Sequence, residues 1–77
     1  MNMYGYRVFE SCVPDQPDRT SYGLELWRYE DGKNERLAVI PDISLHKKPL
    51  LLLAIRCTAG QLNPIHLLDV LDDFFSD

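Results

Sequence analysis

The sequence predicts a single α+β domain spanning residues 1–77: a three-stranded antiparallel sheet followed by an antiparallel helical hairpin packed on one face (βββαα). Before residue 42, apolar and polar residues alternate in segments bounded by turn-forming residues, which is typical of half-buried strands. The last fifteen residues instead have the apolar spacing of a helix. A chain of 77 residues with 45% hydrophobic and 26% charged residues is sufficient for one small core.

The first two predicted strands cover residues 4–10 and 22–28, and each begins with Tyr-Gly. Alternate residues share one face: Tyr4, Tyr6 and Val8 in the first strand, and Tyr22, Leu24 and Leu26 in the second. Gly5 and Gly23 are too few for a phosphate-binding loop, so we expect them to relieve crowding between strands or to let an aromatic ring lie over the backbone. Residues 11–20 contain two prolines and two aspartates, which predicts a turn-rich exposed loop.

A second hairpin is predicted with its turn at residues 31–34 and the third strand at residues 35–40, ended by Pro41. The apolar run 50–57 fits either a buried strand or a helix. Leucine and alanine outnumber β-branched residues there, and Ser44 or a neighbour can cap the N-terminus of a helix. Both features favour a helix, which we expect to end near Gly60. Because this helix is apolar nearly all round, we expect it to be covered on two sides, by the sheet and by the last helix.

The last helix has the clearest start signal, since Asn63 can cap its first turn and Pro64 suits the first helical position. The apolar residues of this helix fall within an arc of roughly 160°: Leu67, Leu68, Val70, Leu71, Phe74 and Phe75. The opposite side is polar: His66, Asp69, Asp72 and Asp73. Ile65 lies off the apolar arc, and we expect the incoming chain to cover it.

Charges at the ends of the two helices oppose their own helix dipoles. Lys47 and Lys48 are at the start of one helix, and Asp72, Asp73 and Asp77 are at the end of the other. An antiparallel hairpin brings these ends together, so we predict that the two sets lie within salt-bridge reach, about 4 Å, or are separated by at most one water.

The C-terminal motif identifies a resemblance. Residues 62–74 read Leu-Asn-Pro-Ile-His-Leu-Leu-Asp-Val-Leu-Asp-Asp-Phe, and together with the Tyr-Gly strand openings and Asp42-Ile43-Ser44 they resemble a family of short uncharacterised proteins of clostridial-type Firmicutes, a domain of unknown function. This resemblance implies a bacterial origin and a shared fold. It transfers no catalytic residue.

Composition excludes several classes of function. A net charge of -4 without a basic patch argues against nucleic-acid binding, and is also too small for an acidic nucleic-acid mimic. The N-terminus does not resemble a secretory leader, and the longest apolar run is far shorter than the roughly 20 residues that span a bilayer. With only Cys12 and Cys57 as thiols, we expect a cytoplasmic protein with reduced cysteines, no membrane contact and no cofactor.

Few residues could form a catalytic or metal-binding site. His66, Asp69 and Asp73 share a helix face at spacings suited to a general base or a metal ligand, but such faces are usually solvated surface. Cys12, Cys57, His46 and His66 are zinc-ligand types without the paired spacing of a zinc site. Cys12 with His66 as its base, and Asp69 beside it, would make a small hydrolase or metal-dependent enzyme, which is the alternative function. No sequence element orients Cys12 toward a histidine.

The aromatic residues favour a different function. If alternation holds, Phe9, Trp27 and Tyr29 lie on the sheet face opposite the core. Interleaved glutamates make protein contact a better expectation than base stacking. The sequence therefore predicts a protein-interaction or regulatory module without a catalytic or metal site, which forms a homodimer or docks on a larger protein through this surface.

Overall fold

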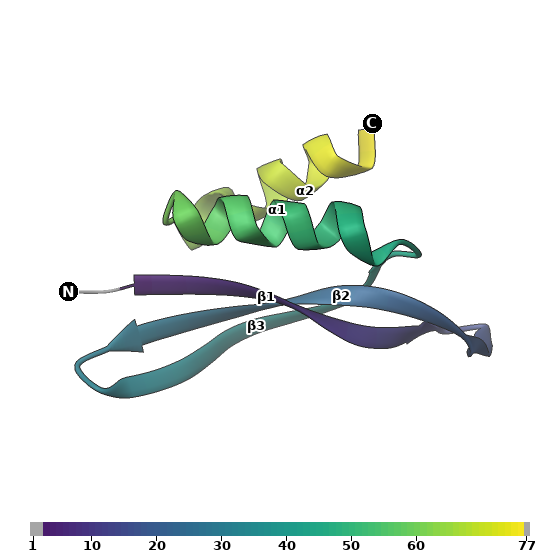
Figure 1. Cartoon of the computed structure of the whole chain (residues 1–77), viewed down its shortest axis with the longest axis horizontal. Helices are drawn as coiled ribbons and strands as arrows, with labels where there is room; N and C mark the ends of the chain where they lie inside the picture. The colour runs from purple at the N-terminus through teal and green to yellow at the C-terminus, as the bar shows by residue number, and fades with distance from the viewer. Residues whose placement is uncertain (1–2, 77) are drawn as a thin grey trace.

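The computed structural model describes residues 3–76 and has the predicted α+β architecture. The elements in chain order are β1 (Met3–Val13), β2 (Gln16–Glu30), β3 (Lys33–Ser44), α1 (Lys47–Ala59), the 3-10 turn η1 (Pro64–His66) and α2 (Leu67–Ser76). The strands form one antiparallel sheet in the order β1-β2-β3. Both helices lie on the same side of the sheet (Figure 1), which leaves its other face without a covering layer.

The core lies between the sheet and the helices. Its buried residues come from all layers: Tyr6, Leu24, Leu26, Ile43, Leu50, Ala54, Cys57, Leu67 and Leu71. The Tyr6 hydroxyl donates a hydrogen bond to the Leu62 carbonyl oxygen at 2.6 Å, which ties the connection between the helices to β1. Burial raises the pKa of Tyr6 to about 12, with Cys57 and Tyr4 adding to the shift, and burial also raises the pKa of the Cys57 thiol.

The predicted loop at residues 11–20 is wrong. Only the two residues between β1 and β2 form the turn, and the flanking residues continue the strands, with Ser11 opposite Ser21 and Cys12 opposite Thr20. The register shifts after Cys12, and Pro17 lies in the irregular stretch. There its missing N–H removes no regular ladder bond, so the proline is compatible with a strand.

The second hairpin is confirmed, but its third strand is longer than predicted. Asp31 and Gly32 both have positive φ, 46° and 81°, and form a two-residue turn closed by the pair Glu30 and Lys33. The strand passes through Pro41 and ends at Ser44. Proline is tolerated because β3 is an edge strand and its register against β2 shifts at this point.

The helix predicted at residues 50–57 is confirmed as α1, and Gly60 caps its end. The expected cap from Ser44 or a neighbour is not formed by a side chain: His46 is the N-cap residue without a side-chain cap hydrogen bond, and the Ser44 hydroxyl accepts a hydrogen bond from the His46 N–H at 3.0 Å. The expectation that the sheet and the last helix both cover this helix holds only in part. Its buried residues, Leu50, Ala54 and Cys57, lie on one face, and Leu53 is half-buried on the side of α2. Three further apolar residues remain largely exposed: Leu51, Leu52 and Ile55.

The predicted helix start at Asn63 is confirmed, since its side-chain oxygen accepts a hydrogen bond from the Ile65 N–H at 3.1 Å. The first turn is a 3-10 turn, and the α-helix begins at Leu67. Burial of the whole apolar arc is wrong, because Leu68 is 71% exposed and Phe75 59% exposed. Ile65 is 77% exposed rather than covered by the incoming chain. The arc is wider than the strip that a single neighbouring helix can cover.

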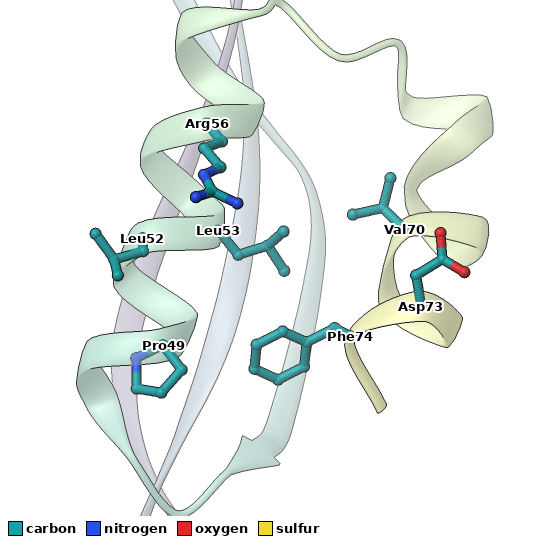
Figure 2. Close-up of a pocket in the computed structure, with 7 residues that line it drawn as sticks. All are labelled: Pro49, Leu52, Leu53, Arg56, Val70, Asp73 and Phe74. Carbon is teal, nitrogen blue, oxygen red and sulfur yellow. The ribbon is translucent and has the colours of Figure 1, made fainter. Parts of the chain in front are cut away.

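The two helices run in opposite directions (Figure 2), as predicted. Within residues 3–76, however, no salt bridge joins Lys47 or Lys48 to Asp72 or Asp73, and Asp77 lies outside the described residues. The predicted direct ion pairs are therefore wrong for the four described side chains. Exposed pairs of this kind stabilise a protein by only about 0.2 to 1 kcal/mol. This gain is small compared with the side-chain entropy lost when two lysines are ordered.

Candidate interaction surfaces

The outer face of the sheet carries the three aromatic residues predicted there. A methyl carbon placed on Gly5 would lie 2.7 Å from Cε2 of Tyr29, and one placed on Gly23 would lie 2.7 Å from Cζ of Phe9. Each ring therefore lies over the backbone of a glycine, as the sequence predicts, and the absence of a Cβ allows the contact. This arrangement leaves Phe9, Trp27 and Tyr29 half-buried even though no helix among residues 3–76 covers this face.

Charged side chains on the same face are organised around Trp27. The Arg7 guanidinium carbon lies 5.4 Å from the centre of the Trp27 ring, a cation–π contact. Arg36 Nη1 lies 3.2 Å from Glu25 Oε2. The Trp27 indole nitrogen is inaccessible and has no hydrogen-bond partner within the described residues. We call this surface the outer sheet face and define it by seven residues: Phe9, Trp27, Tyr29, Arg7, Glu25, Arg36 and Val39. Val39 belongs to it because it pairs with Glu25 across the sheet.

A groove of about 370 Å³ separates the two helices. Figure 2 shows Leu53 of α1 pointing toward Val70 and Phe74 of α2 across this groove. Arg56 and Asp73 are the two charged residues of its lining, and they do not form a salt bridge. Below this groove, buried residues of both helices belong to the same core cluster.

A second groove, of about 620 Å³, runs between β1 and α1. Its lining is mostly apolar and includes Tyr6, Val8, Leu51 and Ile55. The sequence analysis did not predict it. The spacing of Leu51 and Ile55 places them on one flank of a helix, but only the position of α1 over β1 shows that this flank stays uncovered.

The three residues of the predicted polar face lie at the surface. His66 and Asp69 are exposed, and Asp73 lines the groove between the helices. No hydrogen bond or salt bridge joins these three side chains within residues 3–76. In the same part of the chain, no three His, Cys, Asp or Glu side chains are grouped so as to hold a metal ion.

The cysteines are free and lie in different environments, Cys12 exposed and Cys57 buried. Figure 1 places the end of β1, which contains Cys12, and η1, which contains His66, at opposite ends of the molecule. The structure therefore does not bring together Cys12 and His66. The proposed cysteine–histidine pair and the zinc set that included both residues are not assembled in this fold.

Comparison with known families matches residues 1–77 to the model of a family of unknown function, DUF6514. The chain belongs to DUF6514. No curated protein and no solved structure matches this DUF6514 chain. None of its helices within residues 3–76 has the length and apolar character needed to cross a bilayer.

Proposed function

We propose that this DUF6514 protein is a small cytoplasmic protein-interaction module without catalysis, which forms a homodimer through the outer sheet face. The observation that carries this proposal is an excess of exposed surface. The chain exposes 5477 Å², whereas a compact monomer of 8.9 kDa exposes about 4,800 Å². The excess, about 700 Å², approaches the roughly 800 Å² that each partner contributes to a standard interface.

The shape of the molecule supports the same proposal. The radius of gyration is 12.9 Å, compared with about 11.5 Å expected for a compact domain of this length. A sheet with both helices on one side gives this shape, because the other side has no covering layer. A second copy packed against the outer sheet face would supply that layer and convert two open sheets into a sandwich.

The charges of the outer sheet face favour a second copy as its occupant. A two-fold interface brings the same surface together twice, so a self-complementary surface needs both signs of charge. This face has Arg7, Arg36 and Glu25 around the aromatic rings. The protein's net charge of -4 opposes association at long range, but this face itself is not acidic.

Light scattering on concentrated protein tests the proposal. We expect a mass near twice 8.9 kDa, which falls to the monomer value in Trp27→Ser and in Val39→Lys. Val39 is 45% exposed, so lysine there is compatible with folding. Ile65→Lys is the matched control, because Ile65 is 77% exposed on η1 and lies away from the sheet. A monomer mass at high concentration, unchanged by Trp27→Ser, would refute the proposal.

A further inference from the structure

The exposed edge of β1 is closed over only part of its length. Gln61 Oε1 accepts a hydrogen bond from the Tyr4 N–H at 2.8 Å, and Gln61 Nε2 donates to the Tyr4 carbonyl at 3.0 Å. Thr58 Oγ1 accepts from the Tyr6 N–H at 2.9 Å and lies 3.4 Å from the Tyr6 carbonyl oxygen, to which it donates. These two side chains occupy the backbone positions that a neighbouring strand would use.

The next alternate residues of β1 lack such partners. The register against β2 is regular from Met3 to Cys12, so Val8 and Glu10 direct their peptide groups to the same side as Tyr6. In the described part of the chain, no side chain and no backbone group outside the sheet bonds to these peptide groups. The edge of β1 is therefore open from Val8 onward, and an unpaired edge is a template for another strand.

The β1–α1 groove lies beside the start of this open edge. Tyr6 and Val8 line one side, and Leu51, Ala54 and Ile55 line the other. Leu51 is 39% exposed and Ile55 55% exposed, although both belong to an apolar stretch of α1. A strand added to β1 would place alternate side chains against this flank and cover it.

We propose that the open edge of β1 binds an extended segment of a partner protein as an antiparallel fourth strand. The segment carries an apolar residue opposite Val8, which enters the β1–α1 groove, and a lysine or arginine opposite Glu10. Charge complementarity across a strand pair stabilises the complex and fixes its register. The outer sheet face takes no part in this binding, so the inference does not depend on self-association.

A second copy of β1 is a poor occupant of this edge. Antiparallel pairing of two free edges sets Val8 opposite Cys12 and Glu10 opposite Glu10 of the other copy, and like charges directly opposite one another are unfavourable. A shift of the register toward the N-terminus instead sets a free residue against Tyr6, whose peptide group is already bonded to Thr58. The edge therefore favours a foreign strand with a cation at the position of Glu10.

The test uses the synthetic peptide acetyl-Thr-Thr-Thr-Lys-Thr-Val-amide, in which lysine meets Glu10 and the valine meets Val8, so that the peptide ends before the occupied Tyr6 position. Nuclear magnetic resonance of isotope-labelled protein follows its binding. We expect chemical-shift changes in residues 8–12 and in the exposed flank of α1, with slower hydrogen exchange at the Val8 and Glu10 amides. A peptide with glutamate in place of lysine should bind about two- to fivefold more weakly.

Two variants on α1 distinguish binding in the β1–α1 groove from non-specific hydrophobic binding. Ile55→Arg blocks the β1–α1 groove and should abolish binding. Leu52→Arg is its matched control, because Leu52 is 49% exposed on the same helix but lines the groove toward α2. Absence of shifts at Val8 and Glu10 at millimolar peptide, equal binding of the glutamate peptide, or equal loss in the two variants would overturn the proposal.

Discussion

Replacing Tyr6 by phenylalanine removes one hydroxyl from the junction between β1 and the helix connection. That hydroxyl donates a 2.6 Å hydrogen bond to the Leu62 carbonyl oxygen in the partly buried junction. A hydrogen bond of this kind contributes about 1 kcal/mol to the free energy of unfolding. At pH 7 we therefore expect Tyr6→Phe to be less stable than the wild type by about 1 kcal/mol.

The pH dependence gives the sharper part of this prediction. The folded-state pKa of Tyr6 is about 12, above the ordinary value of 10.0. The contribution of the protonated Tyr6 hydroxyl to the free energy of unfolding is fully present below pH 10. It is lost as the pH rises toward 12, because Tyr6 loses its proton at a lower pH in the unfolded chain than in the folded protein. At pH 11, between the unfolded and folded pKa values, the wild type has lost roughly 1 kcal/mol of this contribution. The phenylalanine variant loses nothing at this position, so the deficit of about 1 kcal/mol should disappear.

Urea unfolding followed by Trp27 fluorescence, at one fixed protein concentration, measures both values. The remaining tyrosines are the same in the two proteins, so the difference between them reports on Tyr6. A deficit of equal size at pH 7 and pH 11 would refute the assignment of a buried, hydrogen-bonded Tyr6.

Two further predictions concern the sheet and the thiols. Gly23→Ala should lower the unfolding temperature and reduce the free energy of unfolding by about 1 to 3 kcal/mol, because the alanine Cβ would lie 2.5 Å from the Ile40 carbonyl oxygen. Gly60→Ala is the control: its Cβ would have its nearest contact at 3.3 Å, and the variant should unfold close to the wild-type temperature. Cys12→Ser should leave stability within about 0.5 kcal/mol, since Cys12 is exposed, while Cys57→Ala should cost more through lost core packing. Urea titration checks the cysteine pair, and unfolding of Cys12→Ser alone would contradict it.

Local signals predicted most of the architecture. The alternation around Tyr6 and Leu24, the Asp31-Gly32 turn and the Asn63 cap each reflect short-range physics, and the structure confirms them. The rings over Gly5 and Gly23 match one of the two roles that the sequence indicates for these glycines.

The errors arose where composition was ambiguous or long-range packing decides the outcome. Prolines and aspartates at residues 11–20 suggested a loop, but a proline in an irregular stretch does not end a strand. Burial of Leu68 and Phe75 depended on how much of α2 its neighbours cover. The hydrogen bonds from Thr58 and Gln61 to the β1 edge have no sequence signal, because they join residues more than 50 positions apart.

The most direct test of the interaction function is to dilute isotope-labelled protein and follow its amide and indole resonances. If the outer sheet face forms the homodimer, dilution should shift the signals of Phe9, Trp27, Tyr29 and Val39 and leave those of η1 unchanged. The Trp27 indole N–H, which has no partner within the described residues, is the most informative single probe. Resonances of the outer sheet face that stay constant from millimolar to micromolar protein would contradict self-association through this face.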